Sequence, residues 1–342
     1  MTAARNDNRL PLPPHFDPQR VGEVWRVPYL QRALAAADWT ARHGIQPAAN
    51  DEPRTCLLLI DCQNTFCIPG FELYVGGEGE RGPIGDCRRL CAFIYGNLGH
   101  ITEIVATLDT HSVLQIFHPL FLIDDAGQHP SPLTAVSLED VETGRWQADP
   151  RTAASLGLAP GALQRHLLHY CRQLAAGGKY QLMVWPYHAL LGGIGHALVS
   201  AIEEACFFHA QARHTQTRYE QKGSHPLVES YSALRPEVRE DADGRPLGMR
   251  NDALIEHLLT FDRIVIAGQA KSHCVVWTVE DLLAAMRERD ASLTRKVTLL
   301  ADCASPVVVP GAVDFTEQGE AAYARFAAAG MQVRNAAEVL LE

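Results

Sequence analysis

The sequence predicts an α/β protein with three layers, in which helices cover both faces of a doubly wound, mostly parallel sheet of about six strands. Three observations predict this fold. Short aliphatic runs alternate with helical patterns over most of the chain. The runs are continuously apolar, which is typical of strands that are buried on both faces. Polar residues follow the ends of several runs, and that edge of a parallel sheet is where ligands bind.

The chain begins with an extension. Residues 1–25 are rich in Pro, Asn, Asp and Arg and have no periodicity, which predicts an arm laid over a neighbour. A helix is predicted next, over residues 29–44, because a helical pattern there ends in glycine. We therefore expect residues 1–54 to form an N-terminal arm and residues 55–342 to form a single domain.

The strands and helices of that domain are predicted from the alternation of the two patterns. Strands are expected at residues 55–60, 101–108, 180–185, 214–221, 263–268, 296–301 and 331–335. Helices are expected at residues 84–98, 192–210, 250–261, 274–288 and 317–330.

The pattern weakens at about residues 119–179, where Pro, Gly, Asp and His are frequent. One helix is predicted inside this segment, near residues 160–175. The segment has too few large apolar residues to build a core of its own, so we expect an insertion on the domain rather than a second domain.

The composition excludes several classes of partner. Forty acidic residues against 30 basic ones give a net charge of -10, and the basic residues are scattered, which argues against binding to nucleic acid or to an anionic membrane. No apolar run approaches the roughly 20 residues that span a bilayer, and the first residues lack the apolar stretch of a signal peptide. The nine cysteines include no C-x-x-C pair. We therefore expect a cytoplasmic protein with neither a disulfide framework nor a structural zinc cluster.

Four polar residues follow strand ends and are candidates for catalysis. They are Asp61, Asp109, Lys222 and Cys274, the last of which stands at the head of a predicted helix. The helix N-terminus and a nearby cation would favour the thiolate of Cys274. Asp61 would carry a proton from the thiol to a leaving amine, and Lys222 would hold that acid ionised. Taken alone, each of these residues is as well explained by a helix cap, a solvated loop or a buried structural cysteine.

A second group has the composition of a metal site. Asp109 and His111 are two apart in an extended segment, so their side chains point the same way. His188 follows another predicted strand, and His118 is a fourth candidate. One divalent ion suits these ligands: zinc is the first expectation, and iron and manganese fit as well. With 15 histidines in the chain, surface polar residues are the competing interpretation.

Five segments in order resemble the motifs of the nicotinamidase and isochorismatase-like cysteine hydrolases. The segments are DCQNTFCIPGFELYVGG, LDTHSVLQIFHP, WPYH, YEQKGSHPLVESYSAL and GQAKSHCVVWTVEDLL. The DCASP segment and a last helix also fit the C-terminal part of that family. The resemblance implies the isochorismatase-like, Rossmann-like form of the α/β fold.

The resemblance also implies roles for individual residues. The catalytic triad would be Asp61, Lys222 and Cys274. The Gln269–Ala270 peptide bond would be cis, with the backbone N–H groups of Ala270 and Cys274 facing an oxyanion.

The metal would be bound by Asp109, His111 and His188, with His118 as a fourth ligand one residue further from His111 than in the family. Aromatic rings would stack on a flat substrate. The expected pocket residues are Phe66, Trp185, Gln63 and Tyr231.

The function that follows is hydrolysis of a small carboxamide to an acid and ammonia through a cysteine thioester, with nicotinamide as the first substrate and nicotinate as its product. Other amides of the maleamate, ureidoacrylate or carbamoyl type remain open, because the extension and the insertion enlarge the family core and the insertion would roof the pocket. Two other classes also remain: a metal-activated water hydrolase and a catalytically silent module. The family further implies a homo-oligomer.

Overall fold

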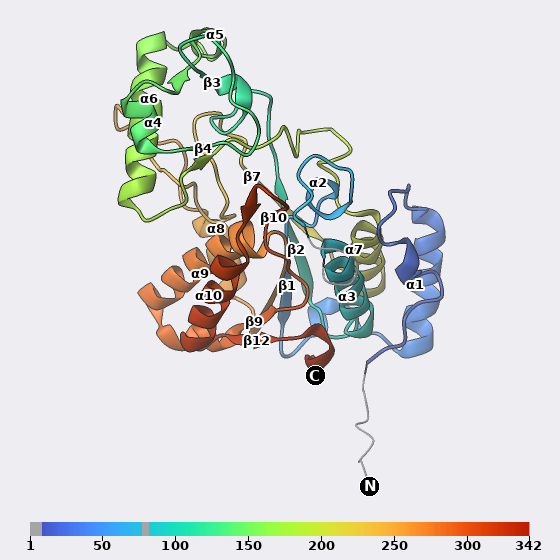
Figure 1. Ribbon diagram of the computed structural model, residues 1–342. Coiled ribbons are helices and arrows are strands. Elements are labelled where there is room, and N and C mark those ends of the chain that lie inside the picture. The colour runs from blue at the N-terminus through green and yellow to red at the C-terminus, as the bar shows by residue number, and fades with distance from the viewer. Residues whose placement is uncertain (1–8, 77–81, 342) are drawn as a thin grey trace.

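The computed structural model describes residues 9–76 and 82–341. Its centre is a sheet of six parallel strands in the order β12-β9-β8-β1-β2-β7, which confirms the predicted fold class (Figure 1). The chain builds outward from β1 through β2 to β7, then returns to the other side of β1 for β8, β9 and β12. The strands are β1 (Thr55–Ile60), β2 (Glu103–Asp109), β7 (Arg218–Lys222), β8 (Arg263–Gly268), β9 (Val297–Leu300) and β12 (Gln332–Arg334).

Helices lie on both faces of the sheet (Figure 1). One face carries α3 (Pro83–Gly96) and α7 (Ser200–Arg213), and α1 (Tyr29–His43) packs on the outside of α7. The other face carries α8 (Asp252–Leu259), α9 (Val276–Arg289) and α10 (Thr316–Ala328). Among the described residues, no helix combines the length and the apolar composition needed to cross a bilayer.

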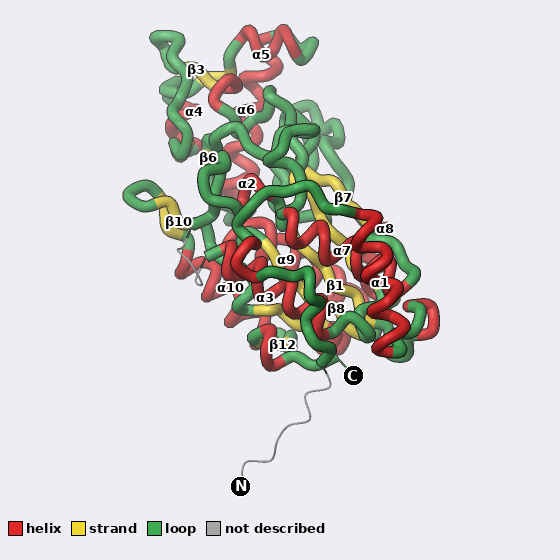
Figure 2. The backbone as a smooth tube through the Cα atoms, turned by 90° about the vertical axis from the view of Figure 1, so that its right-hand side faces the viewer, coloured by secondary structure: helices red, strands yellow, loops and turns green. Residues whose placement is uncertain are grey.

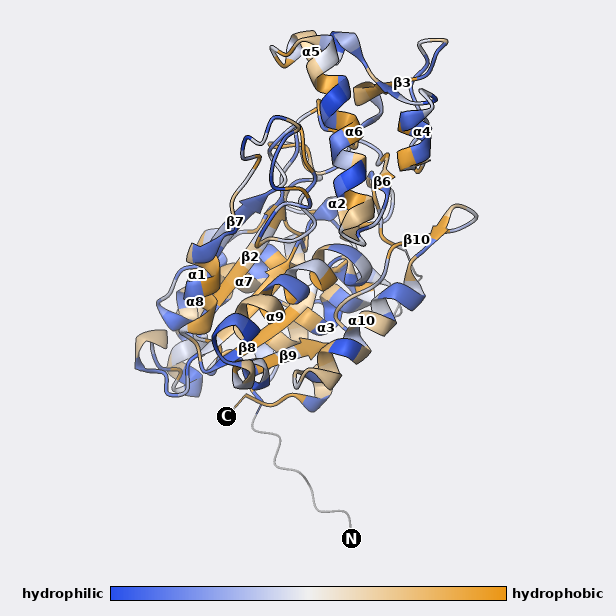
Figure 3. Ribbon diagram, turned by 90° about the vertical axis from the view of Figure 1, so that its left-hand side faces the viewer, coloured by the Kyte–Doolittle hydropathy of each residue, from blue (hydrophilic) through white to orange (hydrophobic). Residues whose placement is uncertain are grey.

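The core forms because the central strands are apolar on both faces, and Figure 3 shows them as an apolar layer between the helices. Every residue of β1 is buried, and its Leu57 lies between Ile104 of β2 and Val265 of β8 in the strand register. Burial of each such aliphatic side chain contributes roughly 1.5–3 kcal/mol to folding. The sheet is therefore a rigid base for the residues that follow its strands.

One predicted strand of the sheet is wrong. Residues 180–185 do not join the central sheet; only β6 (Leu182–Met183) is extended, and it pairs antiparallel with β4 (Ala135–Val136). The apolar run in this segment is short and ends at Pro186, which has no N–H to donate to a ladder. A local aliphatic run does not specify its pairing partner, and here the partner comes from the insertion.

The helix predicted over residues 192–210 begins eight residues later than expected, at Ser200 of α7. The preceding residues form a loop that contains Gly192, Gly193 and Gly195, and Gly192 has a φ of +82°. Glycine has a low helix propensity and adopts positive φ freely, which explains the delayed start.

The insertion forms a lobe beyond the carboxyl ends of the strands (Figure 2). Its largest element, α6 (Pro160–Ala176), agrees with the predicted helix. The lobe also contains α4 (Leu138–Glu142), α5 (Pro150–Ser155), β3 (Leu122–Ile123) and β5 (Gln147–Ala148). Elsewhere the chain forms α2 (Asn64–Cys67) and the hairpin of β10 (Val308–Val309) and β11 (Val313–Asp314).

The described part of the N-terminal arm lies against its own chain. Leu10 N donates to the carbonyl of Gly96 in α3, and Trp25 N donates to Ser200 Oγ at the start of α7. The arm was expected to lie over a neighbour. For the described residues, that neighbour is the helical layer of the same chain. Residues 1–8 of the predicted arm lie outside the described part.

Candidate active site

The sheet brings Asp61, Lys222 and Cys274 together at the carboxyl edge of its strands. Asp61 follows β1, Lys222 ends β7, and Cys274 follows β8. Lys222 Nζ is 3.0 Å from Asp61 Oδ2 and 3.5 Å from Cys274 Sγ. Three residues that are far apart in the sequence thus form one contact group.

The backbone around the group departs from regular structure. Asp61 has a φ of +45°, and the Gln269–Ala270 peptide bond is cis. Cys274 lies within a π-helical turn, Lys271–Val275, immediately before α9. The sequence had predicted Cys274 as the first residue of the α-helix. The sulfur is instead presented by the wide turn that precedes this helix.

Burial governs the charge of the nucleophile and of its base. The Asp61 side chain is fully buried, and Cys274 is 6% exposed. Burial raises the pKa of Asp61, and Lys222 acts in the opposite direction. Burial also raises the pKa of the Cys274 thiol well above its usual value, against the attraction of Lys222. Burial therefore favours the protonated thiol, so a base would have to take its proton before Cys274 could act as a nucleophile.

Thr107 holds Asp61 in place, a role that the sequence analysis missed. Asp61 N donates to Thr107 Oγ1 over 3.1 Å, and that hydroxyl donates to Asp61 Oδ1 over 2.5 Å. The signal was present, because Thr107 is a polar residue in an aliphatic strand and lies two residues before Asp109. The Thr107 hydroxyl fixes Asp61 Oδ1, and Asp61 Oδ2 faces Lys222.

Lys222 connects the catalytic group to the candidate metal group. Its Nζ donates to Asp109 Oδ1 over 2.8 Å and to the Ser230 carbonyl over 3.0 Å. Burial lowers the pKa of Lys222, but Asp109 and Asp61 outweigh it and hold the pKa well above its usual value. The lysine is therefore a fixed cation between two carboxyl groups.

The ligand atoms of Asp109, His111 and His188 lie within 4.8 Å of one another, and all three residues are buried. Asp109 Oδ2 is 2.8 Å from His111 Nε2 and 3.7 Å from His188 Nε2. The Nδ1 atoms of the two histidines face the carbonyls of Gly223 and Pro186, which orients both Nε2 atoms toward the carboxylate. This donor set fits a divalent ion with open coordination positions.

His118 lies beside the three-residue ligand group, and Gln63 has other contacts than predicted. The ring of His118 lies 6.0 Å from that of His111, its Nδ1 faces the Val113 carbonyl, and its nitrogens are outside the ligand group. Its Nε2 is buried and has no hydrogen-bond partner among the described residues, so its role as a fourth ligand stays a prediction. The Gln63 amide bonds to both the N–H and the carbonyl of Asp109, so it fixes the end of β2 rather than facing a substrate.

Each of the three aromatic pocket candidates contacts a histidine ring at the candidate site. Phe66 packs edge-on against His188, with ring centroids 5.6 Å apart. Trp185 and Tyr231 lie 5.7 and 5.0 Å from the ring of His273, which precedes Cys274. His273 was not predicted as a site residue, because nothing in its local sequence distinguishes it from the other histidines.

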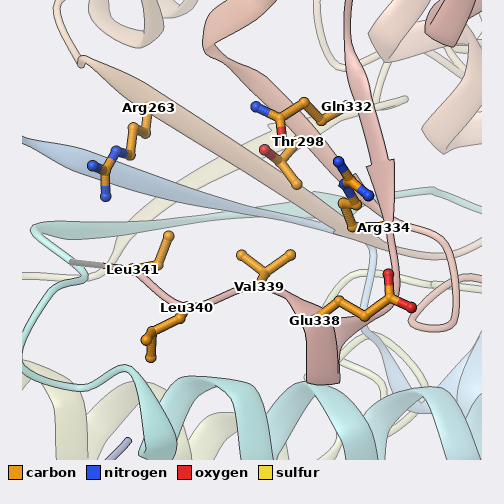
Figure 4. Close-up of a pocket in the computed structure, with 8 residues that line it drawn as sticks. All are labelled: Arg263, Thr298, Gln332, Arg334, Glu338, Val339, Leu340 and Leu341. Carbon is orange, nitrogen blue, oxygen red and sulfur yellow. The ribbon is translucent and has the colours of Figure 1, made fainter. Parts of the chain in front are cut away.

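One large cavity has none of the catalytic or metal-binding residues in its walls. It has a volume of about 820 Å³ and lies on the side of β8, β9 and β12 that the C-terminal residues 338–341 border (Figure 4). Its walls include Arg263, Thr298 and Arg334 but no residue of the catalytic or metal group. A smaller cavity, of about 370 Å³, is lined by Lys222, Gly223 and Ser230 and so borders the catalytic group.

Comparisons with known proteins support the fold. No family model matches the chain, and no curated protein matches it. Among solved structures, the yeast nicotinamidase Pnc1p, also solved with the inhibitor nicotinaldehyde, is similar with a TM-score of 0.50 and 19% identity, over 82% of this chain and 99% of the yeast chain. A nicotinamidase/pyrazinamidase from Acinetobacter baumanii has a TM-score of 0.49 and 18% identity, over 84% of this chain and 99% of that one. At this identity the likeness to the yeast structure shows a shared fold.

Proposed function

We propose that this protein is an amidohydrolase that cleaves a small carboxamide to an acid and ammonia, with Cys274 as nucleophile. The observation that carries the proposal is the contact of Lys222 with both Asp61 and Cys274 at the edge of the sheet. A cysteine, a proton-accepting acid and a cation within hydrogen-bonding reach are the parts that acyl transfer requires.

In the proposed reaction, Asp61 takes the thiol proton as Cys274 Sγ bonds to the carbonyl carbon. The raised pKa of Asp61 suits a base that must release this proton again at neutral pH. Asp61 passes the proton to the leaving nitrogen as the C–N bond breaks, which gives ammonia and a thioester. Water then attacks the thioester, and its proton returns through Asp61 to the sulfur.

Backbone N–H groups of Ala270 and Cys274 are our candidates for stabilising the oxyanion. Within the described chain, the Ala270 N–H donates to no acceptor, so it is free for a substrate oxygen. Lys222 would hold Asp61 in position through both steps. A divalent ion held by Asp109, His111 and His188 would supply a Lewis-acidic point that orients the substrate.

Nicotinamide is the first candidate substrate, because a yeast nicotinamidase shares the fold and Phe66, Trp185 and Tyr231 surround the group with aromatic rings. Another small amide is the second candidate. The insertion favours it, since Tyr180, the residue after its end, donates to the Ser272 carbonyl two residues before the nucleophile and so joins the insertion to the wall of the site. A homo-oligomeric state and a cytoplasmic location remain predictions.

Ammonia release from a panel of amides tests the proposal. We expect Cys274→Ala to lower kcat at least about 10³-fold, because no other group can form the thioester. Cys206→Ala is the matched control: Cys206 is buried in α7, which packs against α1 and α3, and the variant should retain activity. Full activity of Cys274→Ala, or of the iodoacetamide-treated enzyme, would point to metal-activated water instead and refute the proposal.

The metal proposal has its own measurement. After chelation and dialysis, we expect the protein to take up one equivalent of zinc, iron or manganese, counted by elemental analysis. His188→Ala should lose most of this uptake, while His257→Ala, on α8, should keep it. Equal uptake by both variants would rule out the Asp109, His111 and His188 group as the site.

A further inference from the structure

Three buried polar side chains contact one another just before the turn that carries the nucleophile. They belong to Asp86 in the first turn of α3, to Gln269 directly after β8, and to Ser305. Gln269 Nε2 donates to Asp86 Oδ2 over 2.8 Å, and Ser305 Oγ donates to the same oxygen over 2.5 Å. Ser305 N donates to Gln269 Oε1 over 3.0 Å. We call these three residues the polar clamp.

Every polar side-chain atom of the clamp has a partner. Both atoms of the Gln269 amide are bonded within the clamp, and the second oxygen of Asp86, Oδ1, accepts from Arg89 Nη2 over 2.9 Å. A buried polar network whose members are all satisfied is rigid. The clamp can therefore affect a reaction only through the backbone that it holds.

That backbone is held on both sides of Ala270. Before Ala270, Gln269 is fixed by its side chain and by its N–H, which donates to the Ile60 carbonyl over 2.8 Å. After Ala270, Lys271 N donates to the Ser305 carbonyl over 2.8 Å. Ser305 is thus bonded to both residues that flank Ala270. These contacts set the direction of the Ala270 N–H.

The Ala270 N–H is our candidate donor to the oxyanion, and within the described chain it donates to no acceptor. Such a donor lowers the reaction barrier because it already points to the place where negative charge develops. A displacement of about 1 Å at such a site costs roughly 10²-fold in rate. Burying the Asp86 carboxyl group has a desolvation cost, which is explained if the network must fix the direction of this N–H.

We propose that the polar clamp aims the Ala270 N–H at the oxygen of the tetrahedral adduct, so that its three members are positioning residues. This inference rests on the proposed amide hydrolysis. When Cys274 Sγ bonds to the carbonyl carbon, the thiol proton moves to Asp61 and one electron pair of the C=O bond moves to the oxygen. The negative charge on that oxygen exists only after the attack. The clamp therefore stabilises the adduct and not the bound substrate.

Gln269→Leu tests the inference, because leucine has a similar volume and removes both side-chain bonds. We expect kcat for an amide to fall at least about 10²-fold and KM to change less than about threefold. The aldehyde with the same acyl group forms the same oxyanion on Cys274, so its inhibition constant should rise by a similar factor. Alkylation of Cys274 by iodoacetamide displaces iodide and forms no oxyanion. Its rate, followed by mass spectrometry, should equal that of the wild type.

A milder variant and a matched control accompany this test. Ser305→Ala removes one hydroxyl of the clamp and should show the same pattern with a loss of about tenfold in kcat. Thr102→Val removes a buried hydroxyl that donates to Asp51 and accepts from Thr55 N, at the start of β1 and so at the opposite edge of the sheet. It should leave kcat, aldehyde inhibition and alkylation unchanged.

The inference is overturned if alkylation of Gln269→Leu slows in proportion to its kcat, because the clamp would then support the whole site and not the oxyanion donor. Unchanged aldehyde inhibition in Gln269→Leu would also overturn it. An aldehyde adduct that depends on the clamp, without ammonia release from any amide by the wild type, would support the inference and refute amide hydrolysis. Ammonia release with equal kcat by the wild type and Gln269→Leu would do the reverse.

Discussion

At the scale of single residues, the candidate site is a chain of buried charges whose members fix one another. Lys222 touches Asp61 and Asp109, and Thr107 fixes the far oxygen of Asp61. A hydrogen bond to a charged group is worth about 1.5–3 kcal/mol, so each contact has a measurable effect. The orientation of the proposed base therefore depends on a neutral hydroxyl as well as on the lysine.

Thr107→Val tests this dependence, because valine keeps the shape of the side chain and removes the hydroxyl. Thr107 donates to the carboxylate and so favours its ionised form; without it the pKa of Asp61 should rise further. We expect kcat/KM for an amide to fall roughly 10- to 100-fold, and the acidic limb of its pH profile to move to higher pH.

Thr298→Val provides the control, because Thr298 lies on β9 and borders the distant cavity. It should leave both the rate and the profile unchanged. An unshifted acidic limb in Thr107→Val would show that the hydroxyl does not act on Asp61.

At the scale of elements, the approach of β8 to β1 positions the nucleophile. Gly268 ends β8 with a φ of +122°, and a Cβ atom there would lie 2.0 Å from the carbonyl oxygen of Ile60. No larger residue fits without moving one of the two central strands. The turn that carries Cys274 begins three residues later, so this close contact sets where the turn starts.

Gly268→Ala should therefore destabilise the protein by more than about 3 kcal/mol in urea unfolding, or prevent folding. Gly44→Ala is a matched control: Gly44 ends α1 with a φ of +62° and has no atom within 4 Å of its would-be Cβ. It should cost only about 1 kcal/mol. Equal costs at the two positions would show that the approach of β1 and β8 is not the constraint.

At the scale of the whole molecule, stability depends on neutral groups that are buried between layers. His209 of α7 is buried, and its Nε2 lies 2.8 Å from the carbonyl of Ile101, two residues before β2. Burial lowers the pKa of His209 to about 4. The neutral ring is therefore part of the contact between α7 and the sheet.

This histidine should make stability depend on pH. The unfolded chain binds a proton at His209 below about pH 6.5, and the folded chain does so only below about pH 4. Its contribution is complete above pH 6.5 and is lost as the pH falls toward 4, by about 3 kcal/mol in total. Urea unfolding of the wild type and of His209→Gln at pH 7.5 and 4.5 measures this loss. Identical losses in the two proteins would contradict it.

The sequence by itself determined the fold class, most of the elements and the residues that approach Cys274. Aliphatic runs such as β1 are readable because burial on both faces leaves a local pattern, and polar residues at the ends of such runs meet wherever the strands are parallel. Asp61, Lys222 and Asp109 were found in this way.

The tertiary structure alone decided the rest. It paired the β6 segment with the insertion, committed Gln63 to Asp109 and placed the Thr107 hydroxyl against Asp61. The physical reason is that pairing partners, burial and the net electrostatic balance of a side chain are set by atoms distant in sequence. No local pattern contains them.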